Sequence, residues 1–143
     1  MDAIDLDAAA AAIERRIPHW TAAGFDVGGV TWRDAGAGWP YPLVARTEAL
    51  DPDSVGIKCR RGEVEFEVVV YGGHRYAEVG AWADVTGADL ATGELQTASP
   101  EVADVAAFEA LLDETFRQWS RERARVTSSY RVKPPKPSRT EPE

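Results

Sequence analysis

The sequence EVEFEVVVYGGHRYAEVGAWAD, residues 63–84, decides the fold of this chain. Polar and apolar residues alternate on both sides of Gly72-Gly73, which predicts two antiparallel strands joined in a hairpin. A two-residue loop would pair Tyr71 with His74, and a four-residue loop would pair it with Tyr76. Either loop places one set of small and apolar residues on a single face, whereas a three-residue loop would mix the faces. That set is Val64, Phe66, Val68, Val70, Ala77, Val79, Ala81 and Ala83.

The opposite face of this hairpin combines carboxylates with large aromatic side chains, and we predict that it binds a partner. Tyr and Trp often anchor protein interfaces, and carboxylates around them select for Arg and Lys. The alternatives are a solvated face, or aromatic side chains that pack on Glu side chains or under another element. The Trp-Pro-Tyr-Pro loop at 39–42 is a second candidate, or else a hydrophobic plug. The predicted partner-binding residues are Glu63, Glu65, Glu67, Tyr71, Tyr76, Glu78, Trp82, Trp39 and Tyr41.

Shorter strand signals surround the hairpin on both sides. They lie at residues 25–33, 43–47, 55–61 and 93–98. The first is interrupted by Gly28-Gly29, which a β-bulge would explain. The segments DPDS (51–54) and TGADLATG (86–93) have the composition of turns.

Two amphipathic helices flank the strands. Asp5 or Asp7 can cap the first helix, which carries an apolar stripe and runs toward Ala23. Pro18 either kinks this helix or opens a separate last turn. The tripeptide SPE at 99–101 predicts the start of the second helix, because it combines an N-cap, a proline at the first position and an acid. We expect both helices to pack on the apolar face of the hairpin.

This order of elements predicts an α+β fold: an antiparallel sheet of four to five strands with the N- and C-terminal helices packed on one face. The 143 residues suffice for one domain, which we place at 1–125. Residues 126–143 form a basic, proline-rich tail with little apolar surface to bury, and we predict that it is flexible. The tail has three possible roles: keeping the protein in solution, docking on the acidic body, or binding a second partner.

Charge is divided between the body and the C-terminal end of the chain. Residues 1–119 contain 21 Asp and Glu against 9 Lys and Arg, and residues 120–143 contain 3 against 7, for a net charge of −8. An acidic body repels nucleic acid and acidic membranes and attracts basic proteins. We therefore expect a basic protein partner, and neither nucleic acid nor membrane bound by the body.

The composition also predicts a cellular compartment. No stretch approaches the ~18 consecutive apolar residues of a membrane span. The N-terminus is acidic before its apolar residues, unlike a secretory signal. Cys59 is the single cysteine and cannot form an intrachain disulfide. These features predict a cytoplasmic protein.

We predict that the protein is not an enzyme and holds no metal or cofactor. His19, Cys59 and His74 are isolated from one another in sequence, and no motif for a nucleophilic Ser, a zinc protease, a phosphate loop or a dinucleotide occurs. A carboxylate-based hydrolase is a further alternative, which would need its carboxylates in a cleft. The carboxylates available to it are Glu65, Glu67 and Glu78.

The segment RYAEVGAWADVTGADLATGE (75–94) and the helix after it, with SPE and FEALLDETFRQW, resemble the small acidic immunity proteins of bacterial polymorphic toxin systems. In such proteins a small α+β domain blocks a toxin, often a basic nuclease. The resemblance implies a protein-binding inhibitor, an immunity or antitoxin protein for a basic toxin or effector. The first helix with Pro18 and the basic tail depart from that family, and no functional residue is carried over. An intracellular secretion-type chaperone or adaptor is the alternative.

Overall fold

The computed structural model describes residues 3–72 and 80–132, with side chains up to Arg121 apart from position 37. These residues form a seven-stranded antiparallel sheet in the order β3-β2-β4-β5-β6-β7, and β1 pairs with β4 outside this path. The strands are β1 (Asp26–Val27), β2 (Thr31–Asp34), β3 (Leu43–Val44), β4 (Pro52–Arg61), β5 (Val64–Tyr71), β6 (Trp82–Asp89) and β7 (Glu94–Ala98). Two short 3-10 helices, η1 (Ala35–Ala37) and η2 (Arg46–Glu48), flank β3.

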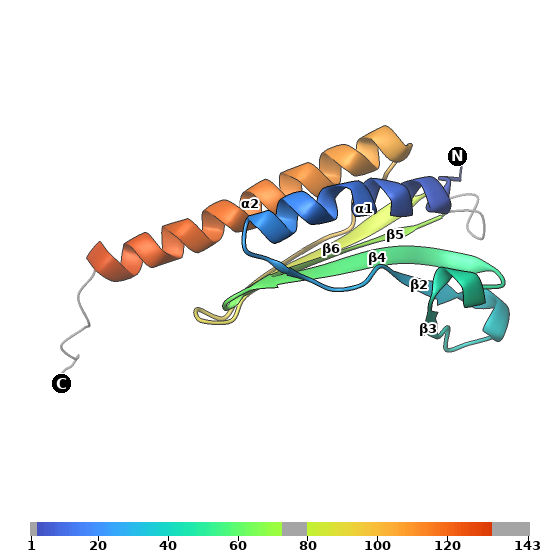
Figure 1. Ribbon diagram of the computed structural model, residues 1–143, viewed down its shortest axis with the longest axis horizontal. Coiled ribbons are helices and arrows are strands. Elements are labelled where there is room, and N and C mark those ends of the chain that lie inside the picture. The colour runs from blue at the N-terminus through green and yellow to red at the C-terminus, as the bar shows by residue number, and fades with distance from the viewer. Residues whose placement is uncertain (1–2, 73–79, 133–143) are drawn as a thin grey trace.

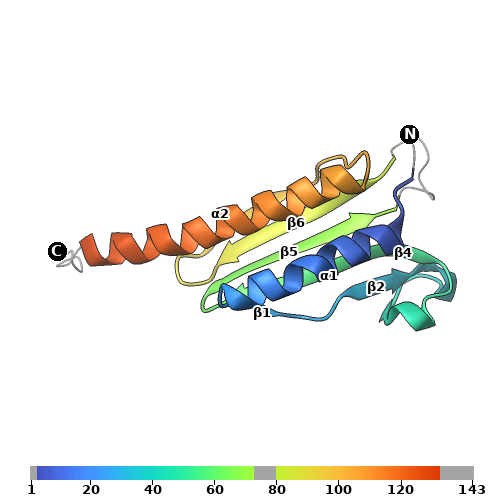
Figure 2. The ribbon, with the colours of Figure 1, turned by 45° about the horizontal axis from the view of Figure 1, so that its top comes forward.

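Helices α1 (Leu6–Ala22) and α2 (Val105–Val132) lie side by side on one face of the sheet, which gives a two-layer molecule (Figures 1 and 2). The predicted α+β class and the placement of both helices are confirmed, with more strands than the four to five expected. α1 continues through Pro18 to Ala22, and α2 runs on past position 125, so that its C-terminal part projects beyond the sheet (Figure 1). No helix in the described part of the chain is long and apolar enough to cross a membrane.

The hairpin forms with a different register from the one predicted. Tyr71 pairs with Trp82, not with His74 or Tyr76, so the connection spans residues 72–81. Gly72 is not the turn, because its amide donates to the carbonyl of Asp53 and its own carbonyl accepts from Ile4. Residues 73–79 lie outside the described residues.

The predicted division of faces nevertheless holds where it can be followed. Val70 pairs directly with Ala83, and both are fully buried under the helices. Ala81 is almost completely buried. A loop of ten residues preserves the alternation of faces as a loop of two or four does, since all three lengths are even. Ala77 and Val79 lie outside the described residues.

Two predicted turns are wrong because sheet pairing overrides their turn composition. DPDS lies largely inside β4, where Ser54 pairs with Tyr71. The first half of TGADLATG belongs to β6, which continues to Asp89, and only residues 90–93 turn. Asp and Gly are tolerated in these strands because neighbouring strands on both sides satisfy their backbone groups.

The predicted start of the second helix at 99–101 is also wrong. The carbonyl of Pro100 accepts from the amide of Ala83 at 3.0 Å, and the amide of Val102 donates to Ala81 at 3.0 Å, so this segment extends the sheet. α2 begins at Val105, and the carboxylate of Asp104 accepts from the amide of Ala107 at 2.8 Å. Asp104 therefore supplies the helix cap that we had assigned to residue 99.

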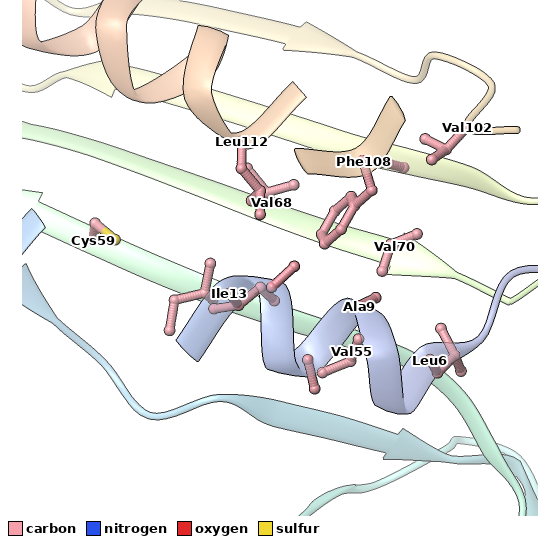
Figure 3. Packing of buried hydrophobic residues seen from close by; sticks show 14 of the residues in the cluster. Leu6, Ala9, Ile13, Val55, Cys59, Val68, Val70, Val102, Phe108 and Leu112 are labelled. Atoms are coloured by element: carbon pink, nitrogen blue, oxygen red, sulfur yellow. The ribbon is translucent and has the colours of Figure 1, made fainter. Parts of the chain in front are cut away.

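The core lies between the helices and the sheet and is rich in aromatic rings at the C-terminal end of α1. Phe66 is fully buried and meets Trp20 and Phe25 edge to face, with ring centroids 6.0 and 5.4 Å apart. Phe116 of α2 contacts the same two rings. Toward the other end, aliphatic side chains accompany the fully buried ring of Phe108, which Figure 3 shows beside Val70.

Ion pairs join the two helices along their outer surfaces. Arg16 binds the carboxylate of Asp113 with two hydrogen bonds, from Nε at 2.7 Å and from Nη2 at 3.1 Å. Glu109 accepts from Arg15 and Arg16. The hydrogen bonds from these arginines lower the pKa of Asp113 and of Glu109 below their ordinary values.

These pairs predict a loss of stability in acid. Because the pKa of Asp113 is lower in the folded than in the unfolded chain, its contribution is present above its ordinary pKa of 3.8 and disappears as the pH falls through the folded value. We expect Asp113→Asn to lower the midpoint of urea unfolding at neutral pH and to differ little from wild type at about pH 2. Glu14→Gln, on the exposed side of α1, is the matched control and should change neither midpoint. An equal effect of Asp113→Asn at both pH values would contradict the assignment.

Candidate functional site

The face of the sheet that lies away from α1 and α2 is the candidate site, and we call it the open face (Figure 1). Directly paired residues of an antiparallel sheet point to the same side, so the strand registers place the side chains of this face in rows. One row runs across five strands at the end of the sheet near β3. Its members are Leu43, Arg33, Ser54, Tyr71 and Trp82.

The structure brings together two of the predicted binding residues, Tyr71 and Trp82. They pair directly between β5 and β6, and their rings stack with centroids 4.7 Å apart and planes 11° apart. Burial raises the pKa of Tyr71, and the nearby carboxylate of Asp84 raises it further. Asp84 also accepts a hydrogen bond from the hydroxyl of Ser99 at 2.7 Å. The result is a half-buried aromatic pair with a carboxylate beside it, a suitable anchor for a cationic partner group.

Cations of the neighbouring strand β4 offset part of the negative charge that we predicted for residues 63–67. Glu65 and Glu67 are on the open face, but the side chain of Glu65 is only 27% exposed, and its carboxylate lies 3.7 Å from Lys58 Nζ and 4.0 Å from Arg60 Nη1. Lys58 pairs directly with Glu67. Glu63 is not on this face, because it lies in the turn between β4 and β5.

Lys58 and Arg60 are open-face residues that the sequence reasoning missed. Their signal was present in the alternation of Ile57, Lys58, Cys59 and Arg60, which turns every second residue of β4 to the open face. Cations of the open face therefore lie on β4 and, with Arg33, on β2, whereas the carboxylate of Asp84 lies on β6.

The loop that carries Trp39 and Tyr41 lies at the same end of the sheet as the aromatic pair. It leads into β3, whose Leu43 begins the row that ends at Trp82. The rings of Trp39 and Tyr41 meet edge to face at 5.4 Å, and Trp39 is 81% exposed. Trp39 is therefore not the hydrophobic plug that we considered, and its loop adds apolar surface beside the open face.

Nothing in the described geometry favours catalysis by the groups weighed from the sequence. Cys59 is buried, and burial raises the pKa of its thiol to about 12, which leaves it protonated at neutral pH. The described residues contain no cluster of His, Cys, Asp and Glu that could hold a metal ion. A groove of about 420 Å³ lies on the helical layer, away from the glutamates of the sheet. It is lined by His19, Asp113, Phe116, Arg117, Ser120 and Arg121.

Three residues weighed from the sequence, His74, Tyr76 and Glu78, lie outside the described residues. The part of the paired-carboxylate hypothesis that involves Glu78 is therefore untested; of the other two glutamates, Glu65 lies within 4.0 Å of two cations. In comparisons with known proteins, no family model, no curated protein and no solved structure matches this chain.

Proposed function

We propose that this protein binds and inhibits a basic protein partner through its open face, in the manner of an immunity or antitoxin protein. The observation that carries this proposal is the stacked pair of Tyr71 and Trp82 on a sheet face that neither α1 nor α2 covers, beside the carboxylate of Asp84. Aromatic residues at the centre of a contact, with charges around them, are the usual anchors of protein interfaces.

The electrostatics support a basic partner. The chain carries a net charge of −8, and the carboxylates of Asp84 and Glu101 lie on the open face beside the aromatic pair. Opposite charge on the partner would accelerate association and orient the two surfaces, and association would slow as salt is added. The cations of β4 would orient the complex further by repelling basic groups from that side.

Trp82→Ala is expected to weaken this complex mainly by accelerating dissociation. Loss of an anchor costs about 2 kcal/mol, equivalent to a dissociation rate about 30-fold faster. Tagged wild-type and variant proteins would be used to capture proteins from the source cell, with quantitative mass spectrometry of what is bound. The recombinant partner would then be titrated by interferometry. Trp82→Phe should restore much of the affinity, because a flat ring remains to stack on Tyr71.

Leu90→Ala, in the exposed turn after β6, is the matched control and should bind as wild type does. The inhibitor proposal also requires that the captured basic protein be toxic or enzymatically active, and that co-expression of this protein suppress that activity. A partner that is delivered unharmed, with no activity suppressed, would support the chaperone or adaptor alternative. Capture of no protein by the wild type would refute both binding functions.

A further inference from the structure

Strand β7 is the last strand at one border of the sheet, and no described segment pairs with its outer edge. Hydrogen bonds between this border and β6 continue beyond Ala98, the last residue of β7. The amide of Ala83 donates to Pro100, and the amide of Val102 donates to Ala81, both at 3.0 Å. Glu101 continues the register of the β6–β7 ladder through a single bridge. The border of the sheet is therefore an extended segment that reaches Glu101.

These bonds determine which backbone groups point outward. In an antiparallel ladder, alternate residues turn their N–H and C=O groups toward the neighbouring strand, and the residues between them turn these groups away. Pro100 and Val102 bond to the β6 side, so the unbroken register turns the N–H and C=O groups of every second residue outward. The outward set is Leu95, Thr97, Ser99 and Glu101. It spans about 20 Å of extended chain.

This border lacks the features that usually protect an edge strand. Proline, lysine, a bulge or a very short strand normally prevents the addition of another chain. At the opposite border, β3 has two residues and follows Pro40 and Pro42. By contrast, residues 95–99 contain no proline or lysine, pair regularly with β6 up to Ala98 and are all exposed, with Leu95 65% exposed. Pro100 does not block the edge, because the N–H that it lacks would face inward.

The charge around this edge selects its partner. Between residues 80 and 116 the sequence has eight Asp and Glu and no Lys, Arg or His. Glu109 and Asp113 are neutralised by arginines of α1. Glu101, paired with Trp82, and Asp84, beside Ser99, lie on the open face at one end of the edge. Glu94, at the other end, pairs with Asp89 and lies on the helical face. A second copy of this chain would bring the same carboxylates and be repelled, whereas a basic strand would be attracted.

We infer that the edge 95–101 binds an extended, basic segment of the partner as an added β-strand. This inference rests on the proposed function, since it assigns to the same basic partner a second point of attachment. The outward N–H and C=O groups would supply the main-chain hydrogen bonds, and lysine or arginine side chains on one face of the segment would meet Glu101 and Asp84 on the open face. Addition of a strand to a sheet edge is a common mode of peptide recognition.

The probe is a fluorescent peptide of alternating lysine and valine, added to the full chain. We expect saturable binding that weakens with salt, and protection from hydrogen exchange at the amides of Leu95, Thr97 and Ser99. A peptide of alternating lysine and proline has the same charge but cannot complete the ladder, and should bind at least tenfold more weakly. An alternating glutamate and valine peptide should not bind.

Thr97→Pro removes an outward N–H and leaves the inward ladder intact, so the fold should persist with an unchanged circular dichroism spectrum. We expect this variant to bind the lysine–valine peptide at least tenfold more weakly. Thr97→Val keeps the N–H and should bind as wild type does. Equal binding by Thr97→Pro, or no protection at the outward amides, would overturn the inference. Protection of these amides in the protein alone, dependent on its concentration, would identify the occupant as a second copy and also overturn it.

The edge inference and the proposed function can fail separately. If Trp82→Ala weakens capture of the basic partner and Thr97→Pro does not, the open face is the binding surface and the edge is not. If the lysine–valine peptide adds to the edge but no basic effector is inhibited, the edge does bind basic strands and the proposed inhibitory function is wrong.

Discussion

Replacing Phe66 by Ala is expected to lower the free energy of unfolding by about 3–5 kcal/mol. Phe66 is fully buried, and its ring contacts Trp20 of α1 and Phe25, which follows that helix. Phe116 of α2 packs on the same two rings, so a cavity at position 66 would lie beneath the place where both helices meet the sheet. Chemical denaturation followed by Trp fluorescence and by circular dichroism would measure the change.

Val69→Ala is the matched control for Phe66→Ala, since it removes apolar volume from the same strand on the open face. Val69 is only partly buried, and its truncation should cost about 1 kcal/mol. Equal effects of the two substitutions would mean that the two faces of β5 are not divided into core and surface. That outcome would also remove the basis for the open face as a binding site.

Gly87→Ala is expected to destabilise the protein by about 1–3 kcal/mol or more, because it overfills the core. A Cβ at position 87 would lie 2.0 Å from two ring carbons of Trp119, which is almost completely buried. The indole cannot move away without displacing α2 from β6. The expected signature is a lower unfolding midpoint together with a changed near-ultraviolet circular dichroism signal from Trp119.

A double-mutant cycle separates this clash from other costs of the substitution. Trp119→Ala alone should cost about 3–5 kcal/mol, and adding Gly87→Ala to it should cost far less than in the wild-type protein, because the added methyl group then faces a cavity. Gly29→Ala is the control, since nothing lies within 4 Å of its Cβ position. Additive effects of the substitutions at 87 and 119 would show that the indole does not lie over Gly87.

The candidate site could be predicted in part. The alternation around Phe66 and Val68 identified the buried face of β5, and the same reasoning placed Tyr71 and Trp82 together on the other face. It did not show that Lys58 and Arg60 would lie next to Glu65. That neutralisation depends on which strand pairs with which, and at what register.

The extended edge at β7 could not be predicted either, because it too depends on pairing between distant segments. The sequence at 99–101 has the composition of a helix start, and an isolated chain could satisfy that preference locally. In the folded protein, Pro100 and Val102 instead complete hydrogen bonds of β6 that would otherwise be unsatisfied. This continuation of the border to Glu101 is what makes the edge long enough to hold a partner strand.

The sequence by itself determined the α+β class, the two helical ends, the apolar face of β5, and the place of Glu65, Glu67, Tyr71 and Trp82 on the opposite face. Periodicity is a local property, so the apolar face of each strand can be identified from the sequence, and any loop of even length keeps the two apolar faces together. Only the tertiary structure decided the pairing of Tyr71 with Trp82, the late start of α2 at Val105, the cations beside Glu65 and the open edge of β7. These features depend on contacts between distant segments, in which hydrogen bonding and packing across the sheet outweigh the local preference of a few residues.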